Sequence, residues 1–180
     1  TGMEYRYLLS ENSGGRLRAA RLRDQIFAES GQGEGVDERW FVDYSHRYDL
    51  PNDWVQRVNL RATSDLRYVR DFPGDLEGHG DPSLENSASI SKNTTRQHFS
   101  AAATYNVNLL QTNAVERTNE AIHRLPELRH SLTQTKLPVV PGYLQMNTLY
   151  TNFTRNGISY DNIQSGNCPS VSRGFTPENC

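Results

Sequence analysis

The sequence predicts an all-β chain of about eight long antiparallel strands, of the kind that forms part of a transmembrane β-barrel. Three observations support this fold class. Polar and apolar residues alternate with a period of two in several runs. These runs reach about ten residues or more, whereas an average soluble strand has about five or six. Short turns also alternate with long connections along the chain, as they do in outer-membrane barrels.

The first two strands are predicted to form a hairpin. Residues 3–9 alternate between apolar or aromatic and polar side chains, and the NSGG segment at residues 12–15 supplies glycines for a tight turn. Residues 15–27 are ambiguous, because their Arg, Ala and Leu content favours a helix. We assign them to a strand, since the neighbouring hairpins would otherwise lack a pairing partner.

The second hairpin, residues 39–48 and 54–63, has the clearest alternation. Its turn is residues 50–53, whose Pro, Asn and Asp are typical turn residues. A third hairpin is predicted from residues 84–91 and 98–109, joined by the short KNTT turn at residues 92–95.

The last pair of predicted strands is residues 125–137 and 143–155. Pro126 fits the start of its strand, because proline is confined to strand starts, edges and bulges. Two connections, residues 71–82 and 111–124, are longer than the turns. In an outer-membrane barrel the short turns are periplasmic, so residues 50–53 and 92–95 are expected there and the two long connections on the outer side.

The composition excludes several classes of protein. The net charge is −2 over 180 residues, whereas nucleic-acid binders usually carry an excess of basic residues, so this class is not favoured. No run approaches the ~18 apolar residues of a membrane-spanning helix. Of the 19 basic residues only Lys92 and Lys136 are lysines, and the arginine excess suits bidentate contact with carboxylate or phosphate. Because the chain opens at Thr1 without a basic and apolar leader, we expect an internal fragment.

No catalytic chemistry is predicted. The sequence has no nucleophile elbow, phosphate loop or zinc-protease motif, so we expect a protein that is not an enzyme and has no cofactor or metal. Cys168 and Cys180 lie close together in sequence and either close a small disulfide loop or remain free thiols. A zinc site there lacks further ligands nearby.

The alternation separates two sets of candidate site residues. A barrel wall needs an apolar outer face, whose aromatics gather toward the strand ends, and a polar inner face. The candidate lipid-facing or girdle residues are Trp40, Tyr44, Trp54, Val58, Leu60, Phe99 and Tyr105. The candidate lumen-facing residues are Arg39, Asp43, Arg47, Arg57, Asn59, Arg61, His98, Asn106 and Arg129. The polar set either solvates a wide channel and pairs internally or forms a dedicated phosphate site.

The order of several segments resembles a known family. MEYRYLLSENSGGRLRAARLRD, LPNDWVQRVNLRATSDLRYVRDF, RLPELRHSLTQTKLP and YLQMNTLYTNFTR together resemble the middle of the barrel domain of LptD, the lipopolysaccharide-assembly or organic solvent tolerance protein. The resemblance covers about residues 2–155. It divides the chain into a barrel segment, residues 1–155, and a polar tail, residues 156–180. Cys168 and Cys180 do not match the cysteines of the family's structural disulfides.

The resemblance implies an antiparallel transmembrane β-barrel segment, a partial barrel, in the outer membrane of a Gram-negative cell. It implies transport of lipopolysaccharide into the outer leaflet, with an LptE-like plug lipoprotein as partner. It also implies a periplasmic Lpt bridge, contacted through a domain absent from this sequence.

Two alternatives remain open on pattern alone. A small porin-like barrel would close within this chain, since about eight strands suffice. A soluble secreted β-sandwich binding module would instead bury the Val58 and Phe99 faces against each other.

Overall fold

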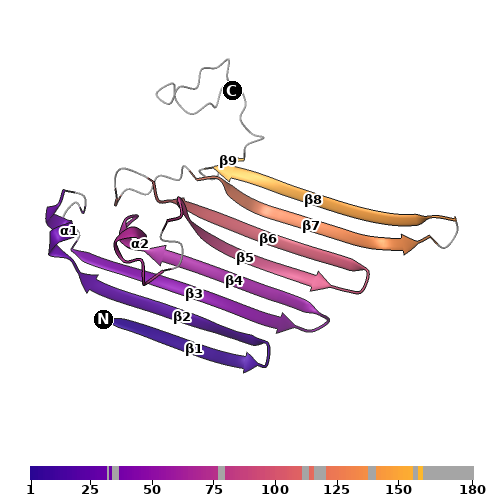
Figure 1. Ribbon diagram of the computed structural model, residues 1–180, viewed down its shortest axis with the longest axis horizontal. Coiled ribbons are helices and arrows are strands. Elements are labelled where there is room, and N and C mark those ends of the chain that lie inside the picture. Colours follow the sequence, from indigo (N-terminus) through magenta and orange to yellow (C-terminus); the bar gives the residue numbers. More distant parts are fainter. Residues whose placement is uncertain are drawn as a thin grey trace, which may run out of the picture.

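Long strands dominate the computed structural model of the chain (Figure 1). The structure describes residues 1–31, 33, 37–76, 80–110, 114–115, 121–137, 141–155 and 158–159. Cys168, Cys180 and most of the predicted tail lie outside the described residues. None of the described helices is long and apolar enough to span a membrane.

One antiparallel sheet contains all the described strands, in sequence order, and each strand pairs with the next along the chain. Eight of the strands are long and the ninth is a two-residue strand. Their bounds are β1 Gly2–Ser10, β2 Ser13–Arg23, β3 Glu38–Leu50, β4 Trp54–Thr63, β5 Ser83–Asn93, β6 Gln97–Asn108, β7 His123–Lys136, β8 Tyr143–Arg155 and β9 Ile158–Ser159. The predicted all-β antiparallel fold of about eight long strands is confirmed.

The sheet is open, because β1 pairs only with β2 and does not meet β8 or β9. A barrel that closes within the described residues is therefore not formed, which removes the basis of the small-porin alternative. The sandwich alternative is also wrong for these residues. Val58 and Phe99 lie in a single sheet with no second sheet over them, and the Phe99 side chain remains 36% exposed.

Short turns lie at one end of the sheet and long connections at the other (Figure 1). The β3–β4 turn is tight because Asn52 and Asp53 adopt positive φ angles of 62° and 63°. Asn and Asp tolerate this left-handed conformation better than most residues. The opposite end carries the helices α1, Gln25–Glu29, and α2, Tyr68–Asp71.

Two local predictions need correction. The strand predicted over residues 15–27 ends at Arg23, and α1 follows because the Asp24 side chain accepts a hydrogen bond from the Phe27 amide at 3.0 Å. Pro126 is not at the start of its strand. It lies inside β7, where the pairing with both neighbours shifts register, so a bulge accommodates the missing N–H.

A small hydrophobic core forms only at the helical end of the described residues. Phe41 on β3 packs with Tyr68, Val69, Leu76 and Leu84, most of which belong to the β4–β5 connection. Within the described part of the chain, most of the sheet has no second layer on either face, so its two faces are the surfaces considered for function.

Candidate functional site

The register of the strands gives the sheet two chemically distinct faces. Directly paired residues in an antiparallel sheet point to the same side, and neighbours along a strand point to opposite sides. Asp43 pairs with Arg18 and Arg61, and Tyr44 pairs with Leu17 and Leu60. Following these pairings across the sheet defines a polar face and an apolar face.

The two predicted sets of site residues separate onto these faces. Pairings through β2–β7 place the nine predicted lumen-facing residues on the polar face and the seven predicted lipid-facing residues on the apolar face. Which face meets lipid remains a prediction at this point. Arg39 and Asp43 differ from the rest of their set, because they are only 2% and 6% exposed and so offer almost no surface to solvent.

Arginines on the polar face converge on Asp43. Arg18 donates to its carboxylate from Nη2 at 2.6 Å and from Nε at 3.1 Å. Arg16 and Arg61 lie at 3.7 Å and 3.8 Å from the same carboxylate. Three guanidinium groups therefore lie within 4 Å of this one carboxylate.

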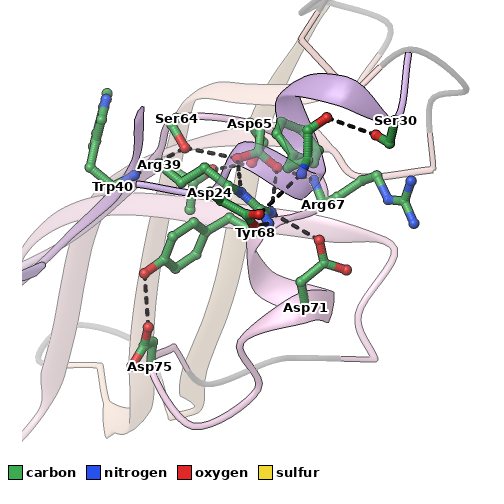
Figure 2. A network of polar contacts seen from close by, with 12 residues as sticks. Asp24, Ser30, Arg39, Trp40, Ser64, Asp65, Arg67, Tyr68, Asp71 and Asp75 are labelled. Carbon is green, nitrogen blue, oxygen red and sulfur yellow. Dashed lines mark hydrogen bonds and ion pairs between the residues drawn. The ribbon is translucent and has the colours of Figure 1, made fainter. Parts of the chain in front are cut away.

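Arg39 anchors the helical end of the sheet to the connections that cover it (Figure 2). Its Nε and Nη2 donate to both carboxylate oxygens of Asp65, at 2.9 Å and 3.0 Å. Nη1 donates to Asp24 at 3.0 Å and Nη2 to Asp71 at 2.9 Å. We call Arg39, Asp24, Asp65 and Asp71 the Arg39 clamp. It joins β3 to the segments that carry α1 and α2.

Aromatic rings shield the Arg39 clamp. The guanidinium carbon lies 4.2 Å from the ring centre of Phe27 and 5.0 Å from that of Phe72, within cation–π range. The Tyr68 hydroxyl donates to Asp75 at 2.8 Å (Figure 2). Burial of the Tyr68 phenol, followed by its contact with Asp75, raises its pKa, so it stays a neutral donor at physiological pH.

The Arg39 clamp is expected to weaken in acid. The hydrogen bond from the Phe27 amide, followed by contact with Arg39, lowers the pKa of Asp24 below its ordinary 3.8. Because the folded-state pKa is depressed, this contribution to stability is present above about pH 4 and is lost as the pH falls below it. Melting temperatures of the purified protein at about pH 6 and about pH 3 test this.

Asp24→Asn is the matched variant, because asparagine keeps a capping oxygen but carries no titratable charge. Its melting temperature should fall less between the two pH values than that of the wild type. An equal fall in both proteins would contradict a role for Asp24 ionisation.

The apolar face is largely exposed. Met3, Tyr5, Leu60 and Tyr150 lie on this face and are 40% exposed or more. Polar atoms on it pair among themselves: the Tyr7 hydroxyl lies 2.9 Å from the Tyr44 hydroxyl and 2.7 Å from His46 Nδ1. An exposed apolar surface that runs across β1–β8 is far larger than soluble monomers normally display.

The polar face changes character at its β8 edge. Leu149 pairs with Arg129 and Phe153 with Arg124, so both apolar side chains lie on the otherwise polar face. They are 57% and 49% exposed. On β8 the polar face is therefore mixed, because Asn147 and Thr151 lie on it beside these two apolar side chains.

Sequence reasoning missed several residues of these sites. Arg16 and Arg18 belong to residues 15–27, whose assignment to a strand is ambiguous from the sequence. Their alternation therefore did not assign them to either face. Asp24, Asp65 and Asp71 are far apart in sequence and meet only through Arg39. In the described part of the chain, no group of three or more His, Cys, Asp or Glu side chains is arranged to hold a metal ion.

Comparison with known proteins identifies similar chains. The model of the family described as "LptD: LPS transport system D" matches residues 37–174, which is more than half of the chain. The LPS-assembly protein LptD of Ectopseudomonas mendocina (strain ymp) is 28% identical over 156 residues, covering 85% of this chain and 16% of the relative. The chain thus spans about a sixth of the length of this curated relative.

Proposed function

The chain belongs to the LptD family of LPS transport system D proteins, and from this premise we propose that it forms part of the wall of a larger outer-membrane β-barrel. That barrel assembles lipopolysaccharide into the outer leaflet of a Gram-negative outer membrane. The chain contributes by forming a transport path and not by catalysis.

The observation that carries this proposal is the contrast between the faces of one open sheet. The strands β1–β8 have 9 to 14 residues, and about 9–11 suffice for a tilted strand to cross the hydrocarbon core. The exposed apolar face suits contact with acyl chains, and Trp40, Tyr44, Trp54, Val58, Leu60, Phe99 and Tyr105 then face lipid. An open sheet needs further strands to close its edges, which fits a chain that covers a small part of its relative.

The polar face suits the lining of a lumen. An amphiphile with charged sugars needs a hydrated path, and Arg47, Arg57, Asn59, Arg61, His98, Asn106 and Arg129 provide polar groups along it. Asp43 is only 6% exposed and holds arginines of this face in place. In this orientation the short turns are periplasmic and the helical end, with the Arg39 clamp, is external. An LptE-like plug lipoprotein and a periplasmic Lpt bridge complete the proposed machine through parts outside this chain.

Site-specific photocrosslinking in the full-length protein tests this function. Ser87 and Ala88 are neighbours on β5, with Ser87 on the polar face beside Asn59 and Ala88 on the apolar face beside Val58. A photoreactive residue at position 87 should crosslink to lipopolysaccharide in living cells. The crosslink should fade when the supply of newly made lipopolysaccharide is stopped, because the lumen holds the lipid only in transit.

Position 88 is the control. Crosslinks there should go to bulk membrane lipid and should not depend on that supply. Absence of supply-dependent crosslinks at position 87, in protein that is correctly inserted, would contradict the transport path.

A further inference from the structure

A shallow pocket of about 270 Å³ lies on the polar face, near the short turns of β1–β2 and β3–β4. Three arginines line it, Arg16, Arg47 and Arg57, together with the polar side chains of Ser45 and Asn59. Gly14 also lines it and pairs with Arg47 across the strands. We call this the arginine pocket.

The arginines of this pocket are incompletely neutralised. Arg47 donates to Asp49 at 3.1 Å, while Arg16 is 3.7 Å from Asp43, which Arg18 already engages. Arg57 is exposed and has no ion-pair partner among the described residues. The pocket therefore presents guanidinium donors that the described residues pair only in part.

The strand register brings these like charges together. Arg47 pairs directly with Arg57, and Arg6 pairs directly with Arg16. Like charges directly opposite each other destabilise a sheet. A bound anion between Arg47 and Arg57 removes that repulsion, so the arrangement is more favourable with a ligand than without one.

The shape of the pocket also depends on glycine. A Cβ at Gly14 would lie 2.7 Å from the Tyr7 carbonyl oxygen, which is backbone and cannot move aside easily. A side chain at Gly14 would therefore push against β1, and with glycine there this edge of the pocket carries no side chain.

We propose that the arginine pocket binds a phosphate group carried on a saccharide, through Arg47 and Arg57 with Arg16 at its side. The planar guanidinium fork matches the oxygens of phosphate and forms charge-assisted, bidentate hydrogen bonds. Ser45 and Asn59 offer hydrogen bonds to neighbouring hydroxyls of the sugar. The saccharide part of this assignment rests on the proposed function. The anion site rests on the geometry of the pocket.

In this scheme the pocket is a holding site on the wall of the lumen. Its position near the short turns puts it close to the proposed periplasmic entrance, so phosphorylated sugars would meet it early in transit. An exposed site of this kind should bind weakly and release readily, and salt should weaken the binding.

Binding to the purified full-length protein in nonionic detergent tests the proposal. The probes are glucosamine 1-phosphate, inorganic phosphate and glucosamine. Glucosamine 1-phosphate should bind more tightly than inorganic phosphate, and glucosamine should not bind measurably. Arg57→Gln should weaken binding of the sugar phosphate roughly tenfold or more, because it removes an ionised bidentate partner.

Arg96→Gln is the matched control. Arg96 is exposed in the β5–β6 turn at the same end of the sheet, outside the pocket, and its loss changes the net charge equally. Its effect on affinity should stay below about twofold, since exposed distant charges are screened. Heat-modifiable migration in SDS gels verifies that both variants are folded.

If Arg57→Gln and Arg96→Gln weaken binding of the sugar phosphate equally, or if Arg57→Gln has no effect, the arginine pocket is not the binding site. Tighter binding of inorganic phosphate than of the sugar phosphate would overturn the saccharide assignment. These failures are distinguishable from failure of the proposed function. If the position-87 crosslinks persist while phosphate binding is absent, the transport path stands and the pocket assignment is wrong.

Discussion

Replacing Arg39 by alanine is expected to destabilise the helical end of the sheet by about 3–5 kcal/mol, the usual cost of removing one partner from a buried ion pair. The Arg39 side chain and its partner Asp65 are both nearly inaccessible to water. Without the guanidinium, Asp65 remains buried with its charge unpaired, and Asp24 and Asp71 lose the group that holds α1 and α2 against β3. Denaturant titration of the purified protein measures the loss.

Arg129→Ala is the control for this prediction. Arg129 lies on the same face, but its side chain is 53% exposed and its contact with Glu127 is 3.9 Å long. Exposed pairs of this kind contribute about 0–1 kcal/mol. A comparable loss of stability in the two variants would contradict the clamp, as would protease resistance of the α1 and α2 segments in Arg39→Ala.

Ala103→Arg is expected to hinder membrane insertion of the full-length protein by about 2–4 kcal/mol, the cost of an arginine on the lipid face near the bilayer midplane. Ala103 lies near the middle of β6 on the apolar face, beside Ala88. Leu60→Arg should act in the same direction, because Leu60 is on the apolar face and 46% exposed. The amount of inserted, heat-modifiable protein in outer-membrane fractions reports the effect.

Adjacent residues provide the controls. Ala102→Arg makes the same substitution one residue away, on the polar face beside Glu127, and should be nearly silent. Asn59→Arg should likewise be tolerated. If Ala102→Arg and Ala103→Arg reduce insertion equally, the two faces do not meet different environments and the lumen and lipid assignments fail together.

The sequence predicts the sheet well because alternation is a local signal. Each run of period two specifies which residues share a face, and the short turns specify which strands pair. Alternation therefore places Trp40 and Asp43 on opposite faces of the sheet, and they lie on opposite faces in the register of β3 with its neighbours. Which face of the sheet contacts lipid and which lines the lumen depends on strands outside this chain, so that assignment stays a prediction.

The Arg39 clamp could not be predicted in this way. Its carboxylates come from the N-cap of α1, from the residue that precedes α2 by three positions and from α2 itself, and no local pattern links them. The short helix α1 was missed for a related reason. Its start depends on the capping contact of Asp24, and the apolar alternation of the preceding strand gave no sign of where that strand ends.

The β8 strand shows a further limit of pattern reading. Its residues alternate weakly, with large apolar side chains at both even and odd positions such as Met146, Leu149, Tyr150 and Phe153. Only the pairing with β7 shows that Leu149 and Phe153 share the face of Arg129. Two bulges in β7 shift that register, and bulges have no reliable signature in a single sequence.

The most direct test of the central claim is the environment of positions 102 and 103 in the membrane-embedded full-length protein. Cysteines introduced at Ala102 and Ala103, in a background with Cys168 and Cys180 replaced by serine, would carry a nitroxide spin label. The account predicts that the label at position 103 collides with oxygen dissolved in the lipid, and the label at position 102 with a water-soluble nickel complex. Equal accessibility at both positions, or the reverse pattern, would contradict a barrel wall with its polar face toward the lumen.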